Sequence, residues 1–113
     1  MEDRFAQQMK KGILEMLVLQ TLCRSPGHGY ELINRLKTRS GGLFTMKEGT
    51  LYPILYRLED EGLIRASWAQ DRAAPKKVYE ATQAGLAENA RRLALWEEFT
   101  KTVGTFLEGD EEQ

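Results

Sequence analysis

The sequence predicts a mainly α-helical domain with one small β-hairpin (an α+β fold), followed by a long helix near the C-terminal end. Three observations indicate this fold. Apolar residues recur at three- and four-residue steps in four segments, two short segments between residues 64 and 81 are rich in strand-forming residues, and glycine or proline separates several of these segments. Steps of three and four place an apolar stripe on one side of a helix.

Length and composition are those of one ordinary domain. The chain has 113 residues, of which 42% are hydrophobic and 29% charged, so it can bury a core and has no room for a second independent domain. Its longest apolar stretch, residues 12–23, is interrupted by polar side chains, lacks a following cleavage site and is shorter than the about 20 residues that span a membrane. We expect a cytoplasmic protein with no membrane partner.

Cysteine and histidine are too few for an internal disulfide or a zinc site, which leaves a redox-sensor role of the single Cys23 as the alternative to a structural one. The single Cys23 excludes an internal disulfide, and together with the single His28 it cannot form a zinc cluster. We expect Cys23 to be a small buried residue and His28 to lie on the surface of a turn. Because no nucleophile–base pair or phosphate-binding glycine loop is visible, we expect no catalytic residue, no cofactor, no metal and no enzymatic activity.

The charge is distributed unevenly. The net charge is −1, but residues 1–82 carry 13 Lys and Arg against 10 Asp and Glu, whereas residues 83–113 carry 3 against 7. The acidic excess therefore lies in the C-terminal part. This division permits a basic face on the first part of the chain.

The first two predicted helices are separated by a tight turn. The first covers residues 9–24 and carries an apolar stripe on one side. Residues 25–29 contain one proline and two glycines, which end a helix and permit the turn. The second helix runs from Tyr30 to about Arg39, where Ser40 and two glycines stop it.

The third predicted helix begins with a capping box and ends at a glycine. Thr45 and Glu48 match the S/T-x-x-E pattern, in which the two side chains bind free amides at a helix start. The apolar stripe continues to Leu58, and Gly62 is suited to the left-handed backbone of a C-terminal cap. Pro53 lies inside this segment and should bend the helix without ending it.

A hairpin is predicted next. Residues 64–68 alternate apolar and polar side chains, and residues 78–81 contain strand-forming Val and Tyr. Residues 69–77 form the loop between them. Trp68 should lie in the core between this hairpin and a helix.

The last predicted helix, residues 82–107, is about 37 Å long and longer than a compact three-helix domain needs to cover itself. Its apolar surface should seek a second copy of the chain, since two-fold pairing is the commonest symmetry. The residues assigned to this dimer interface, or alternatively to an effector pocket, are Leu86, Leu93, Trp96, Phe99, Val103, Phe106 and Leu107. The expected organisation is a helical domain with a hairpin at residues 1–82, a dimerisation helix at 83–108 and a disordered acidic tail at 109–113.

Three short helices followed by a hairpin is the order of a winged helix-turn-helix domain, whose third helix enters the major groove of DNA. The N-terminal part of such a helix attracts phosphate, and side chains off its apolar stripe supply hydrogen-bond donors. The predicted DNA-binding residues are Tyr30 on the second helix, Lys47, Thr50, Tyr52 and Arg57 on the third, and Arg72, Lys76 and Lys77 in the hairpin loop.

Four motifs in this order and spacing give the chain a specific resemblance. They are Gly29-Tyr30-Glu31-Leu32, Glu48-Gly49-Thr50-Leu51-Tyr52-Pro53, Arg57-Leu58-Glu59-x-Glu61-Gly62-Leu63-Ile64 and Lys76-Lys77-x-Tyr79-x-x-Thr82-x-x-Gly85. The sequence resembles the PadR-like transcriptional regulators over residues 10–107. The resemblance implies a homodimer that binds an inverted-repeat operator in double-stranded DNA, usually as a repressor. In such a domain the hairpin, here residues 64–81, is called the wing. The resemblance also implies that Tyr30, Thr50, Tyr52 and the wing lysines, Lys76 and Lys77, lie at the DNA.

Each of these assignments has a structural alternative. Tyr30 and Tyr52 are equally well explained as part of the core, Thr50 as a plain surface residue, and Arg57 as the partner of Glu61 one helical turn on. Trp96 fits dimer packing or, as an exposed flat ring, stacking on a small aromatic effector. The alternative function is a small-molecule sensor or a protein-interaction adaptor on the same scaffold, without DNA affinity.

Overall fold

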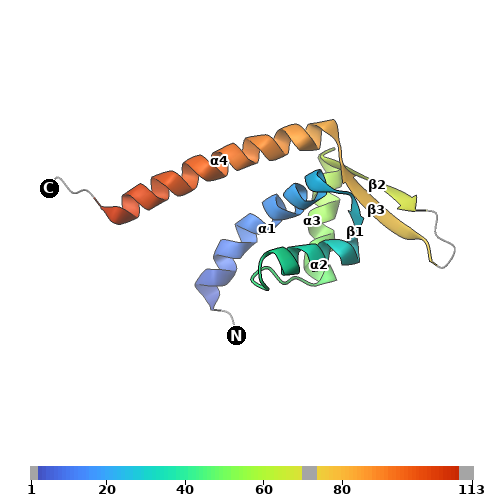
Figure 1. The fold of residues 1–113 in the computed structure, drawn as a ribbon, viewed down its shortest axis with the longest axis horizontal. Coiled ribbons are helices and arrows are strands. Elements are labelled where there is room, and N and C mark those ends of the chain that lie inside the picture. The colour runs from blue at the N-terminus through green and yellow to red at the C-terminus, as the bar shows by residue number, and fades with distance from the viewer. Residues whose placement is uncertain (1–2, 70–73, 110–113) are drawn as a thin grey trace.

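The computed structural model describes residues 3–69 and 74–109. Over these residues the chain forms four helices and three short strands (Figure 1). The helices are α1 (Arg4–Arg24), α2 (Gly29–Arg39), α3 (Glu48–Asp60) and α4 (Gln83–Glu108), and the strands are β1 (Gly27–His28), β2 (Ile64–Ala69) and β3 (Lys76–Ala81). The predicted fold class, mainly helical with a small sheet, is confirmed.

The hairpin is part of a three-stranded sheet. Strand β3 lies in the middle and pairs antiparallel with β1 and β2, with Tyr79 opposite both Gly27 and Ala66. Residues 25–29 were predicted to form a simple turn, and this prediction is wrong for Gly27 and His28, which form strand β1. Strand β1 is too short to produce any alternating pattern in the sequence.

The helix starts differ from the predicted ones because other side chains cap them. Helix α1 begins at Arg4 instead of near Met9, since the Asp3 carboxylate accepts a hydrogen bond of 2.8 Å from the amide of Ala6. The predicted capping box at Thr45 is wrong: the Thr45 hydroxyl donates to the carbonyl of Gly42 at 2.9 Å, and α3 begins after Lys47 with no side-chain cap.

The capping box of this fold belongs to α2. The His28 Nδ1 atom accepts a hydrogen bond from the amide of Glu31, and the Glu31 carboxylate accepts one from the amide of His28 at 3.0 Å. His28 is thus a half-buried cap and not a plain surface residue. This hydrogen bond from the backbone of His28 is the main reason that the pKa of Glu31 is lowered.

The core lies where the first three helices meet the sheet. The fully buried side chains are Val18, Leu19, Leu22, Leu32, Leu51, Leu55, Leu58, Ile64 and Tyr79. Burial raises the pKa of Tyr79 to about 12. Cys23 is half-buried against this core, and its burial raises the pKa of its thiol.

Helix α4 is anchored to the domain through its first turns. The Thr82 amide donates to the carbonyl of Leu63 at 3.0 Å, and its hydroxyl donates to the carbonyl of Gly62 at 2.7 Å. The same hydroxyl oxygen accepts from the amide of Gly85 at 3.0 Å. Gly85 is buried, and a Cβ atom there would overlap the Leu63 carbonyl oxygen. The turn after α3 and the start of α4 are therefore in direct backbone contact.

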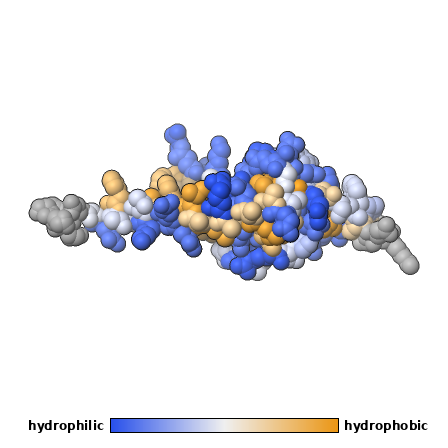
Figure 2. Space-filling model, turned by 90° about the horizontal axis from the view of Figure 1, so that it is seen from above, coloured by the Kyte–Doolittle hydropathy of each residue, from blue (hydrophilic) through white to orange (hydrophobic). Residues whose placement is uncertain are grey.

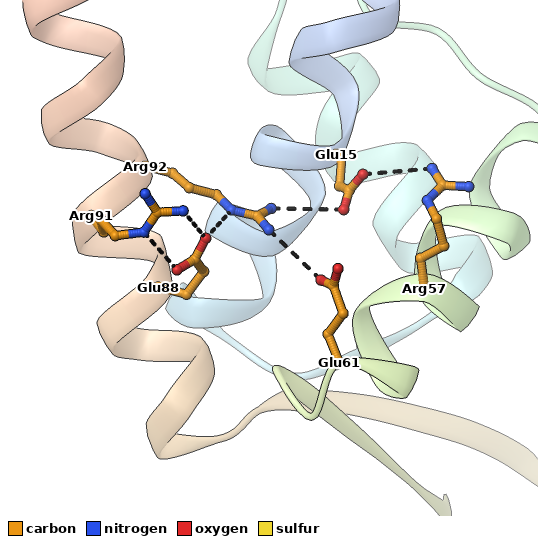
Figure 3. A network of polar contacts seen from close by, with 6 residues as sticks. All are labelled: Glu15, Arg57, Glu61, Glu88, Arg91 and Arg92. Carbon is orange, nitrogen blue, oxygen red and sulfur yellow. Dashed lines mark hydrogen bonds and ion pairs between the residues drawn. The ribbon is translucent and has the colours of Figure 1, made fainter.

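A charged network extends this anchor to α1 and the end of α3 (Figure 3). Arg92 on α4 lies 2.7 Å from the carboxylate of Glu88 and 3.8 Å from those of both Glu15 and Glu61. Glu15 on α1 also lies 3.6 Å from the guanidinium of Arg57 on α3. Through these contacts the half-buried Arg92 joins α4 to α1 and to the end of α3 at one point.

Beyond this point α4 leaves the domain. Figure 1 shows it running over α1 and then past it, away from the sheet. Its only buried residues are Gly85 and Asn89, and the Asn89 amide donates to the Gln20 side chain at 2.6 Å. The predicted tail residues 110–113 lie outside the described residues.

Gly85→Ala should destabilise the protein. We expect the free energy of unfolding to fall by about 1–3 kcal/mol, because the new methyl group overlaps the Leu63 carbonyl and overpacking of this kind costs that much. Gly49→Ala is the control, since no described atom lies within 4 Å of a Cβ at that exposed helical position. It should leave stability unchanged or raise it by up to about 1 kcal/mol in urea denaturation. Equal stability of the two variants would contradict the anchor.

The Glu88 carboxylate should make stability depend on pH. Hydrogen bonds from Arg91 and Arg92 lower the pKa of Glu88 from 4.5 to about 2. A pKa depressed in the folded state contributes stability above the unfolded value, and that contribution is lost as the pH falls toward the folded value. The difference in unfolding free energy between the wild type and Glu88→Gln should therefore shrink from about pH 5.5 to about pH 3.

Glu97→Gln is the control for this pH series. Glu97 lies on the same helix and makes no ion pair within the described part of the chain. Urea denaturation at each pH should show no comparable change for this variant. A pH-independent difference for Glu88→Gln would show that the network does not hold this carboxylate as the anion.

Candidate nucleic-acid interface

A groove of about 580 Å³ opens between the start of α2, one side of α3 and the β2–β3 hairpin. It brings together side chains that are far apart in the sequence and rich in aromatic rings and positive charge. The lining residues are His28, Gly29, Tyr30, Glu48, Tyr52, Tyr56, Trp68, Pro75, Lys76, Lys77 and Tyr79. Four of the predicted DNA-binding residues, Tyr30, Tyr52, Lys76 and Lys77, lie in this one groove.

The start of α3 is exposed and has no side-chain cap. Lys47 precedes the helix, and Glu48, Gly49 and Thr50 form its exposed first turn. The first amides of a helix have no partner within it, so an uncapped start attracts anions such as phosphate. Lys47 and Thr50 lie on this surface beside the groove and not in its lining.

The two predicted tyrosines have different environments. Tyr30, at the start of α2, is 69% exposed, so the core alternative is wrong for it. Tyr52 is half-buried against the core, and its hydroxyl lies so close to Gly29 that a Cβ there would overlap it. Glycine at position 29 therefore lets Tyr52 approach the start of α2, and the Tyr52 hydroxyl is held at the groove.

The wing contributes two lysines to the groove. Lys76 is exposed, and the Nζ atom of Lys77 lies 5.7 Å from the centre of the Tyr79 ring, a cation–π contact that orients the charge. Arg72, the third predicted residue of the wing, lies outside the described residues.

Arg57 lies outside the groove lining. Its guanidinium reaches Glu15 on α1 at 3.6 Å, and Glu61, its predicted partner, pairs with Arg92 instead. The predicted pairing of Arg57 with Glu61 is therefore wrong. Arg57 remains more than half exposed and belongs to the network that joins α3 to α1 and α4.

Two exposed aromatic residues of the groove, Tyr56 and Trp68, are absent from the predicted site. Tyr56 follows Tyr52 by one helical turn, so the four-residue spacing was a signal that the sequence offered. Trp68 is 66% exposed, and its predicted place in the core is wrong. It lies on the same face of β2 as Ile64, which is buried in the core, and Ala66, which is only partly buried against it. Trp68 comes next along this face and lies beyond the edge of the core.

A second surface, on α4, is apolar. Of the residues assigned to a dimer interface or effector pocket, Leu93 is half-buried, and the others are exposed, from 38% for Trp96 and Val103 to 81% for Phe106. Figure 2 shows apolar side chains along this part of the molecule, between hydrophilic ones. A groove of about 710 Å³ lies between α1 and α4, lined by Gly12, Glu15, Met16, Arg92, Leu95, Trp96, Glu98, Phe99 and Thr102.

No helix within residues 3–69 and 74–109 is long and apolar enough to cross a membrane. Within the same ranges no three His, Cys, Asp or Glu side chains are grouped so that they could hold a metal ion.

Comparison with known proteins identifies related chains. The model of the transcriptional regulator PadR-like family matches residues 18–91. The transcriptional regulator YqjI of Escherichia coli (strain K12) is 33% identical over 101 residues, which are 85% of this chain and 47% of that one. The chain thus spans about half the length of this relative.

Solved structures agree over nearly the whole chain. A PadR family transcriptional regulator from Eggerthella lenta DSM 2243 is 33% identical, with a TM-score of 0.85 over 94% of this chain and 91% of that one. A PadR-like regulator from Bacillus cereus is also 33% identical, with a TM-score of 0.77 over 91% and 99% of the two chains. The family model covers well over half of the sequence and the same fold recurs in these relatives, so this chain belongs to the PadR-like family of DNA-binding transcriptional regulators.

Proposed function

We propose that this chain is a sequence-specific repressor that acts in the cytoplasm and binds an inverted-repeat operator as a homodimer. The observation that carries the proposal is that Tyr30, Tyr52, Lys76 and Lys77, which come from three separate elements, line one groove together with Glu48 at the exposed start of α3. Phosphate contacts from such donors fix the orientation of a protein on the duplex, and side chains of the inserted helix read base edges. In this arrangement α3 enters the major groove, and the wing follows the backbone.

The side chains that contact base edges would lie on the exposed first turns of α3. Thr50 projects from this surface, and Lys47 adds a positive charge at the helix start. Lys76 and Lys77 supply charge-assisted contacts that are independent of sequence. Arg57, already paired with Glu15, would contribute to DNA binding only by exchanging that partner for a phosphate.

The apolar face of α4 supports the homodimer. Phe99, Phe106 and Leu107 are at least 65% exposed, and large contiguous apolar surfaces on soluble proteins mark sites of association. A second copy would present the same face under two-fold symmetry. It would also place two copies of α3 about one DNA turn, roughly 34 Å, apart, so that the operator is a near-palindrome.

The groove between α1 and α4 supports an effector site. Its volume of about 710 Å³ is in the range of small-molecule sites, and the Trp96 and Phe99 rings lie on its wall. A small aromatic effector bound there would release the repressor. A sensor or adaptor without DNA affinity is the second candidate, because this groove would serve it equally well.

DNA binding should be specific and sensitive to salt. In a mobility-shift assay with the DNA upstream of its own gene, the wild type should bind more tightly than to random duplex at about 150 mM salt. Lys77→Ala should weaken binding to both DNAs and reduce the slope of log K against log salt by about 0.9, the contribution of one phosphate contact. Equal affinity of the wild type for the two DNAs would favour the sensor or adaptor.

Dimerisation should depend on α4. Sedimentation of the wild type at micromolar concentration should give a dimer, and Phe99→Asp combined with Phe106→Asp should give a monomer, because both side chains are exposed on the proposed interface. The helical content measured by circular dichroism should be retained. A monomeric wild type would refute the α4 interface.

A further inference from the structure

We propose that Trp68 of the wing and Tyr56 of α3 form a clamp for one sugar–phosphate strand of the duplex, with the backbone passing between them. The inference rests on the proposed DNA-binding function and adds two contact residues to it. Both side chains line the same groove as Tyr52 and Lys77.

The position of Trp68 explains its exposure. In β2, Ile64 is buried, Ala66 packs partly against the core, and Trp68 on the same face is 66% exposed. Its register partner on β3 is Lys77. Residues directly opposite each other in an antiparallel pair lie on the same face, so the indole and the ammonium group share one wall of the groove.

Tyr56 stands on the opposite wall. It follows Tyr52 by one turn of α3, and the centres of the two rings are 6.1 Å apart at an interplanar angle of 37°. Tyr52 is fixed against Gly29, whereas Tyr56 is 55% exposed. The fixed ring therefore supports the exposed one at the edge of the groove.

The chemistry of the two walls fits a sugar–phosphate strand. The indole N–H and the phenolic O–H are donors for phosphate oxygens, and the ring faces offer apolar contact to deoxyribose. Lys76 and Lys77 outnumber Glu48, the one acidic residue in the described lining, so the groove favours an anion over a neutral or cationic ligand. Because both donors address the backbone, their contribution should be the same for every DNA sequence.

The test compares neutral substitutions in mobility-shift assays across a salt series. Trp68→Ala and Tyr56→Ala should each weaken binding to operator and random duplex alike by about tenfold, the loss of one hydrogen bond to a charged group. The salt slope should not change, in contrast to Lys77→Ala, because no cation is removed. Ser67→Ala is the matched control: it lies on the other face of β2, is exposed and should bind as the wild type does.

Fluorescence supplies an independent readout. The chain has two tryptophans, so the signal of Trp68 is the difference between the emission of the wild type and that of Trp68→Phe. Saturating duplex DNA should change this difference and protect it from iodide quenching. If the proposed repressor function is wrong, the wild type itself will bind operator and random duplex with equal affinity. The clamp itself is overturned if the wild type binds operator while Trp68→Ala and Tyr56→Ala bind within twofold of it, or if Trp68 stays equally open to iodide.

Discussion

The contact between Gly85 and the carbonyl of Leu63 is the constraint on which the arrangement of the molecule depends. It allows α4 to begin directly against the turn that ends α3, and Thr82 seals the junction with hydrogen bonds to the same turn. Since β3 runs straight into α4, this single junction sets the direction of the long helix relative to both α3 and the wing. Arg92 repeats the constraint two turns later by reaching carboxylates on α1 and at the end of α3.

The junction separates two surfaces with different chemistry. On one side, the start of α3, the start of α2 and the wing form a groove lined by rings and lysines. On the other, α4 carries apolar side chains into solvent beyond Asn89. A charged network lies between these two surfaces. Glu15 belongs to this network and also lines the groove between α1 and α4, together with Trp96. An occupant of that groove would therefore touch a residue that is one ion pair away from α3.

The periodic features were predictable from the sequence, and the features that depend on tertiary contacts were not. The four helices and the hairpin follow from apolar spacing, and Tyr30, Tyr52 and the wing lysines follow from their places in that order. The predicted cap of α3 was wrong because the Thr45 hydroxyl donates its hydrogen bond to the Gly42 carbonyl instead. The cap of α2 was not predicted because histidine, the residue at that position, is rarely an N-cap. Trp68 lies on the face of β2 that carries the buried Ile64, as its alternating pattern predicts, but the core does not extend as far as Trp68. The extent of the core depends on where the neighbouring helices end, and the pattern along β2 carries no information about that.

We propose that two copies of this domain, paired through α4, present their two α3 helices to one face of the duplex. Hydroxyl-radical footprinting on the DNA upstream of the gene tests this most directly. The expected result is two protected windows related by a dyad, with centres about one helical turn apart, and additional protection of the backbone where the wing lies. A single window without a dyad, or uniform protection along the fragment, would contradict it.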